Sequence, residues 1–259
     1  MIKTSSATVA AAISSLLLIT TTDVATAAQI KILAGSAIET AMALLIPQFE
    51  QSSGHRVTFD FNGAIGAMTD RVRKGEAADV VIVSRQQIEA LEKENKVVSG
   101  SRADIAKVGV GLFVRKGAPK PDISSVDAFK RTMLAARSIG WNDPAAGAPV
   151  SIYLIGLLER LGIADVMKPK IVAFKERSER FAAVARGDVE IGFNQISEII
   201  AAPGVDLVGP LPAPIQNYTL FAGGTVATSK EQEAAKALVQ FISSTDAQIT
   251  WKAKGFEAP

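Results

Sequence analysis

The sequence predicts an α/β fold with two lobes, each a mainly parallel sheet flanked by helices, and a ligand cleft between them. Strand-like and helix-like segments alternate along almost the whole chain. Two glycine- or proline-rich stretches have the composition of crossings between lobes, and several helices begin with small or polar residues just after a strand. The 259 residues are 48% hydrophobic, which is enough material for two cores.

Strands are expected where short apolar runs rich in β-branched residues lie between turn residues. The first run, QIKILA, ends at the Gly35-Ser36 pair. The expected strands are residues 29–34, 56–61, 79–83, 107–115, 138–141, 170–173, 190–193, 206–208 and 218–227.

Helices are expected where apolar residues recur every three or four positions. The first follows Gly35 directly, and Ser36 and Glu39 have the spacing of a capping box at its start. The expected helices are residues 37–51, 65–74, 85–94, 126–135, 150–161, 178–186, 196–201, 230–243 and 246–254.

Two stretches divide the chain. The apolar run VGVGLFV at residues 108–114 carries two glycines, and a second glycine- and proline-rich stretch covers residues 203–214. If both cross between lobes, residues 109–208 form the second lobe, and residues 29–108 with 209–259 form the first. The alternative is that both stretches are surface loops of a single sheet.

Residues 1–28 have the pattern of a secretory signal: a short basic start, an apolar stretch at 9–19 and small residues at 25–28. The apolar stretch is too short for a membrane span, which needs about 20 residues. We therefore expect cleavage before Ala28 or Gln29 and a soluble protein in the Gram-negative periplasm. The chain has no cysteine, which excludes disulfides and a lipid-modified N-terminal cysteine.

Several classes of partner and reaction are disfavoured. A net charge of +2 is too small to favour nucleic acid. His55 is the sole histidine, so a zinc site is not expected, and the first helix separates it from Ser36, so a serine hydrolase triad is not expected either. Gly109-Val110-Gly111 lacks the rest of a dinucleotide motif. We expect a monomer with no cofactor, no metal and no enzymatic activity.

The helix starts point to a small anion. Four of them carry small, amide or hydroxyl residues, at Ser36, at residues 62–64, at 143–151 and at 175–178. A helix N-terminus offers unpaired N–H groups and about half a positive charge. Because the carboxyl ends of strands meet at one crevice in such sheets, several helix starts can surround one anion there.

The mature chain resembles the molybdate-binding proteins of ABC importers, which have the type II periplasmic binding-protein fold. The matching stretches are ILAGSAIETAMALLIPQFEQSSGHRV, NGAIGAMTDRVRKGEAADVVIVS, PVSIYLIGLLERLG and VARGDVEIGF, and the second is the most specific. The resemblance implies that hydroxyls and backbone amides from loops after successive strands hold the anion.

Carried over by position, the serine of the first loop is Ser36 and the amide of the second lobe is that of Val150. Three positions depart from the family: Ala64 replaces a serine, Gln195 replaces a tyrosine, and Arg177 stands where an apolar residue is usual. The full set of expected ligand-binding residues is Ser36, Asn62, Ala64, Val150, Ser151, Arg177, Ser178 and Gln195.

Arg177 leaves two interpretations open. If its guanidinium points into the cleft, it suits a carboxylate or a phosphate-like group. If it points outward, it pairs with a neighbour such as Glu176 or Glu179.

The expected function is capture of a small anion and its delivery to an ABC permease in the inner membrane. The resemblance implies molybdate or tungstate, and an organic acid or another oxyanion is the alternative ligand. A regulatory effector-binding domain is disfavoured by the leader, and a secreted hydrolase by the missing catalytic residues.

Overall fold

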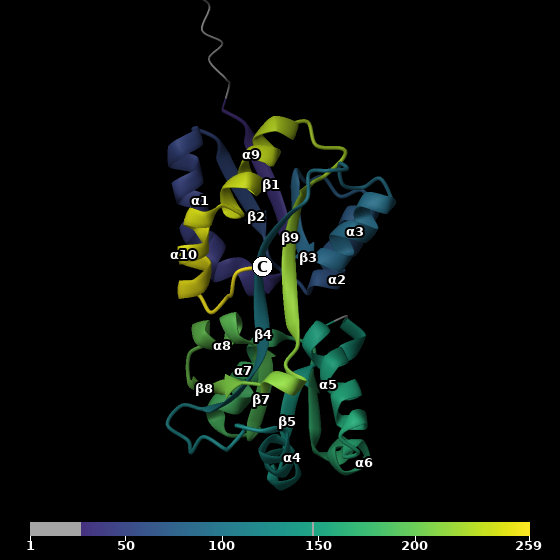
Figure 1. Cartoon of the computed structure of the whole chain (residues 1–259), viewed down its shortest axis with the longest axis vertical. Coiled ribbons are helices and arrows are strands. Elements are labelled where there is room, and N and C mark those ends of the chain that lie inside the picture. The colour runs from purple at the N-terminus through teal and green to yellow at the C-terminus, as the bar shows by residue number, and fades with distance from the viewer. Residues whose placement is uncertain (1–26, 147) are drawn as a thin grey trace, which may run out of the picture.

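The computed structural model describes residues 27–146 and 148–259, which gather into two lobes (Figure 1). The strands are β1 Gln29–Ala34, β2 Arg56–Asp60, β3 Val80–Ser84, β4 Ala103–Arg115, β5 Ile139–Asn142, β6 Ile171–Phe174, β7 Ile191–Gln195, β8 Val205–Pro210 and β9 Tyr218–Thr225. The helices are α1 Glu39–Ser53, α2 Ile65–Arg73, α3 Arg85–Lys93, α4 Val126–Ala135, α5 Pro149–Arg160, α6 Ala164–Met167, α7 Arg177–Arg186, α8 Ile196–Ala201, α9 Gln232–Ile242 and α10 Thr245–Ala253. Short 3-10 turns occur at η1 Ser36–Ile38, η2 Pro144–Ala146, η3 Lys168–Lys170 and η4 Ala213–Ile215.

The predicted α/β alternation is confirmed, and most elements lie within a few residues of their expected bounds. The periodicity missed α6, because a helix of four residues is too short to show a repeat. The expected strand at 107–115 also began too late for β4, because the polar residues Asp104 and Lys107 interrupt the apolar run at its start. None of the helices in the described ranges has the length and hydrophobicity of a membrane span.

Within the described residues one nine-stranded sheet runs through both lobes in the order β2-β1-β3-β9-β4-β7-β5-β6, with β8 paired to β4. β1 is parallel to β2 and β3, and β5 is parallel to β6 and β7. The joining strands β4 and β9 run antiparallel to their neighbours. Each lobe is therefore parallel in its outer part and antiparallel near the junction.

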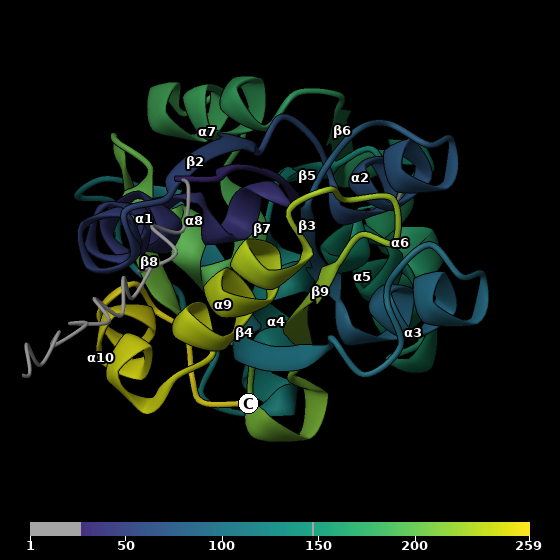
Figure 2. The same cartoon turned by 90° about the horizontal axis from the view of Figure 1, so that it is seen from above.

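The first lobe buries β1, β3 and β9 between helices. In both views α1 and α10 lie to one side of these strands and α2 and α3 to the other (Figures 1 and 2). Its core includes Ile32, Met42 and Trp251, which are all fully buried. The C-terminal segment returns to the junction, where Glu257 bridges to Lys107 on β4.

β4 is the outward crossing between the lobes. Its first half, to Gly109, pairs with β9, and its second half, from Val110, pairs with β7 and β8. The hydrophobic cores divide at the same place, with Val108 in the first core and Val110 in the second.

The return crossing lies beside it. The Gln216 side chain accepts the N–H of Val110 at 2.9 Å through Oε1 and donates to the Val110 carbonyl at 3.0 Å through Nε2. Between β8 and Gln216, Leu211 and Ile215 are buried in the second core. The second lobe therefore extends beyond the boundary expected at residue 208. The reason is that β8 pairs with the second half of β4, which keeps the proline-rich turn on that lobe.

The expected leader, residues 1–28, lies outside the described residues apart from its last two positions. Ala28 already belongs to the folded part, because its carbonyl accepts the N–H of Arg56 at 2.8 Å.

Candidate functional site

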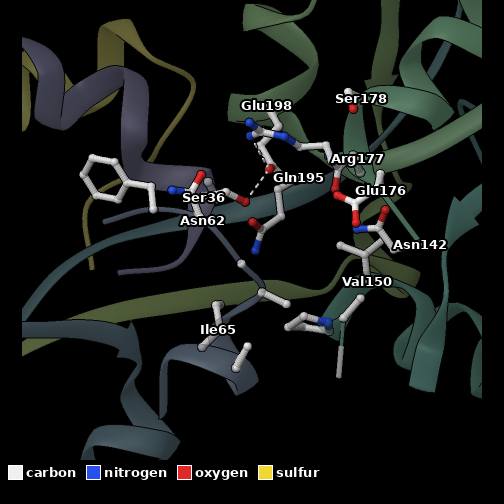
Figure 3. Close-up of a pocket in the computed structure, with 18 of the residues that line it drawn as sticks. Ser36, Asn62, Ile65, Asn142, Val150, Glu176, Arg177, Ser178, Gln195 and Glu198 are labelled. Atoms are coloured by element: carbon white, nitrogen blue, oxygen red, sulfur yellow. Dashed lines mark hydrogen bonds and ion pairs between the residues drawn. The ribbon is translucent and has the colours of Figure 1, made fainter. Parts of the chain in front are cut away.

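A cleft of about 490 Å³ lies where helix starts and strand ends of both lobes meet (Figure 3). The residues that line it are Ser36, Ala37, Phe61, Asn62, Gly63, Ala64, Ile65, Ala67, Asn142, Ala148, Pro149, Val150, Lys175, Glu176, Arg177, Ser178, Asn194, Gln195 and Glu198.

The turn after β1 forms one edge of the cleft. At Gly35 the chain passes so close to α2 that a β-carbon would lie 2.7 Å from Ile65 Cγ1, so a side chain there would push the two helix starts apart. The expected capping box is wrong, because Ser36 lies inside the 3-10 turn η1 and α1 begins only at Glu39. The Ser36 hydroxyl caps no helix and donates instead to Glu198 Oε1 at 2.9 Å.

The loop after β2 forms a second edge. Asp60 accepts the N–H of Asn62 at 2.9 Å and the guanidinium of Arg71 at 2.7 Å, and these bonds, that of Arg71 first, lower the pKa of Asp60. The loop then enters α2, whose first backbone bond runs from Met68 N to Ala64 O. The preceding amides of α2 have no partner within the helix and can face a ligand.

The second lobe contributes the starts of α5 and α7. Val150 is in the first turn of α5 and lines the cleft, whereas Ser151 is 1% exposed and does not. Arg177 and Ser178 begin α7, which follows β6. Their N–H groups lie ahead of the first backbone bond of that helix, from Arg180 N to Glu176 O.

Arg177 points into the cleft and joins a charged cluster that links both lobes (Figure 3). Its Nη1 donates to Glu198 Oε1 at 2.9 Å, and its Nη2 lies 3.4 Å from Glu39 Oε2. Burial alone would lower the pKa of Arg177, but Glu198 and Glu39 together raise it above its ordinary value. The neighbours Glu176 and Glu179 were expected as partners only for an outward-pointing Arg177, and its partners in the cleft are instead distant in the chain.

The floor of the cleft is rich in donors. Asn194 Nδ2 and Gln195 Nε2, at the end of β7, are buried and have no hydrogen-bond partner among residues 27–146 and 148–259. Both line the cleft, as do Ser36, Arg177 and Glu198. A ligand that fits here must therefore offer several acceptor atoms.

The structure brings all the predicted site residues to this cleft except Ser151. Their contacts with a ligand remain predictions. Sequence reasoning missed Asn142, Asn194 and Glu198. Asn142 and Asn194 lie at strand ends, so the same rule that identified Asn62 could have found them. Glu198 carries no such signal, because it lies in the first turn of α8 and not at a strand end, and it reaches Ser36 only through the fold.

Residues 30–257 match the sequence profile of a family described as bacterial extracellular solute-binding protein. The chain belongs to this family. The two lobes and the cleft between them are the architecture of such binding proteins, and the predicted fold class is confirmed by a solved structure. The Azotobacter vinelandii periplasmic molybdate-binding protein superposes with a TM-score of 0.73 at 20% identity, over 89% of this chain and 99% of that one.

Two curated relatives of this solute-binding protein carry different names. It is 35% identical over 205 residues to a Pseudomonas protein named aconitate isomerase, covering 78% of this chain and 77% of that one. It is 26% identical over 242 residues to the molybdate-binding protein ModA of Azotobacter vinelandii, covering 90% and 91%. The predicted resemblance to molybdate-binding proteins is therefore confirmed, and the relatives do not agree on a ligand.

Proposed function

We propose that this protein is the periplasmic solute-binding component of an ABC importer and that its cleft captures a small organic anion with more than one carboxylate. The observation that carries the proposal is Arg177, whose guanidinium stands in the cleft where the molybdate-binding pattern has an apolar residue. Its planar fork matches a carboxylate in two parallel hydrogen bonds, whereas a compact tetrahedral oxyanion is already satisfied by amides and hydroxyls.

Three further observations support a carboxylate. Ala64 removes a hydroxyl donor expected for an oxyanion, and Gln195 replaces another. The buried amide groups Asn194 Nδ2 and Gln195 Nε2 are donors in the cleft that can bond to carboxylate oxygens. Aconitate, named in the 35% identical relative, is a tricarboxylate.

A thermal-shift screen followed by calorimetry tests the ligand class. It compares cis-aconitate, trans-aconitate, citrate and tricarballylate with molybdate, tungstate and sulfate. A ligand at about 100 times its Kd stabilises the folded state by about 2.7 kcal/mol, which raises Tm by roughly 5–10 °C in a protein of this size. We expect the carboxylates to raise Tm and Arg177→Gln to abolish that rise. A rise with molybdate or tungstate alone contradicts the proposal and restores the oxyanion ligand.

Export to the periplasm is part of the same proposal and rests on the pattern of residues 1–28. Mass spectrometry of protein from a periplasmic extract should find a chain that starts at Ala28 or Gln29. A membrane-bound form that retains Met1 contradicts it.

Glu198 favours a second candidate function, isomerisation of an unsaturated carboxylic acid. Its side chain is 8% exposed and lines the cleft, and Ser36 and Arg177 each donate to its Oε1 at 2.9 Å. Moving a carbon–carbon double bond requires a base that takes a proton from one carbon and returns it to another. Incubation with trans-aconitate in D2O, followed by NMR, tests this function. Deuterium on carbon together with cis-aconitate, both lost in Glu198→Gln, is the expected result for an isomerase, and an unchanged spectrum excludes it.

A further inference from the structure

Arg180 is a buried cation on α7 that the proposed ligand contacts leave unused. It lies one turn after Arg177, and its side chain is 1% exposed. Its Nη1 donates to Asn142 Oδ1, while Nε and Nη2 have no hydrogen-bond partner among the described residues. Its guanidinium lies over the ring of Phe181, with 5.0 Å to the ring centroid.

Within the part of the chain that the structure describes, this arrangement leaves a positive charge without a carboxylate bonded to it. Burial lowers the pKa of Arg180 to about 10; Glu198 opposes that shift and the positive charge of Arg177 adds to it. The group therefore stays protonated at neutral pH. A buried cation that lacks its own counter-ion destabilises the ligand-free protein, and an anion bound nearby recovers part of that free energy.

Asn142 connects Arg180 to the cleft. It ends β5 and lines the cleft beside Glu176 and Val150 (Figure 3). Because its Oδ1 accepts from Arg180, its Nδ2 remains a donor that a ligand can use. Arg180 thus orients an amide of the site and places a positive charge directly behind it.

We infer that Arg180 is a positioning and specificity-determining residue, which holds Asn142 as a donor and makes the cleft prefer anions with two or more charges to monoanions. The charge of Arg177 is already offset by Glu198, so among the described residues the buried charge of Arg180 remains for a second anionic group. This inference rests on the proposed capture of an anion, but it applies to a carboxylate and to an oxyanion alike.

Pairs of probes in which one member carries two or more negative charges and the other carries one test the inference. The first pair is trans-aconitate and its dimethyl ester, which is a monoanion, and the second is molybdate and perrhenate. Calorimetry on the wild type should give tighter binding of the more charged member of the pair that binds. Arg180→Met should weaken binding of the more charged member about ten- to a hundredfold and binding of the other about threefold or less, because only the more charged member needs the second positive charge.

Two further variants serve as controls. Arg180→Lys keeps the charge and should retain most of the preference. Arg186→Met removes an exposed cation from the other end of α7 and should change either affinity by about threefold or less, because it lies outside the cleft and water and salt screen its charge. If Arg180→Met does not fold, Arg180→Gln replaces it.

The melting temperature of the ligand-free protein supplies an independent readout. Since the buried charge is not compensated, Arg180→Met should melt at or above the wild-type temperature. A lower melting temperature with an unchanged charge preference shows a purely structural role and overturns the inference, as does an equal loss of affinity for both members of a pair. Binding of molybdate instead of trans-aconitate, with the preference still dependent on Arg180, contradicts the carboxylate proposal and supports the role of Arg180.

Discussion

Glu198→Gln removes a negative charge from the cleft and keeps an oxygen that can accept the same hydrogen bonds. In the wild type Glu198 Oε1 accepts from Ser36 Oγ and from Arg177 Nη1, each at 2.9 Å. An anion bound by Arg177 lies close to this carboxylate and is repelled by it. We therefore expect the variant to bind an anion more tightly than the wild type.

The size of the gain follows from Coulomb's law. Two like charges about 6 Å apart repel by about 3 kcal/mol at an effective dielectric constant of about 20, and by about 0.7 kcal/mol in bulk water. The cleft is open to water and Arg177 is 40% exposed, so an intermediate value of about 1.5 kcal/mol is appropriate. This corresponds to about tenfold in Kd. Loss of the half-exposed ion pair should lower stability by at most about 1 kcal/mol.

Calorimetric titration with trans-aconitate at low and at physiological salt measures the gain. Glu39→Gln is the matched control, since Glu39 is 46% exposed and lies 3.4 Å from the same guanidinium. Its effect on Kd should be about twofold or less. Binding that weakens tenfold in Glu198→Gln would refute the reasoning, because the carboxylate would then be an acceptor for the ligand. An equal gain in both variants would show that only the net charge of the protein matters.

Three other substitutions probe the site, the crossing between the lobes and the acid response. Ser36→Ala should weaken anion binding about tenfold, because the wild-type hydroxyl can turn from Glu198 and donate to the anion. The melting temperature should stay within about 2 °C, because this hydroxyl caps no helix. Calorimetry and thermal melts that show the reverse contradict its role in the cleft. Gln216→Ala removes both bonds to Val110 at the crossing, so the two crossing strands are held together less firmly. Small-angle scattering should find a larger ligand-free radius of gyration, and an unchanged value contradicts this role of Gln216. Hydrogen bonds from Arg71, and to a smaller extent from Lys31, lower the pKa of Glu76 to about 2. Its ionised carboxylate therefore stabilises the fold above the unfolded pKa, and this stabilisation is lost as the pH falls from about 4.5 to about 2. Glu76→Gln should flatten the stability profile in that window, and an unchanged acid limb would show that the group contributes nothing.

The sequence alone was sufficient for the fold class and for most of the elements. Strands such as β1 and helices such as α4 are encoded locally, because the spacing of their apolar residues and their turn residues belongs to a few neighbouring positions. Ligands of open α/β sheets bind beyond the carboxyl ends of the strands, and this rule located the cleft loops at Ser36, Asn62 and Val150 from the order of the residues.

Only the tertiary structure decided which groups meet in the cleft. Glu198 is far along the chain from Ser36, and the fold alone brings its carboxylate within hydrogen-bond distance of that hydroxyl and of Arg177. The capping box failed for the same reason: Ser36 and Glu39 each found a partner across the cleft in place of one another. Arg180 has the pattern of an ordinary helical arginine, and the packing of α7 buries it beside Asn142. Charge pairing and burial depend on contacts between segments distant in sequence, so local pattern determines the helix on which Arg177 and Arg180 stand, and packing determines what their charges face.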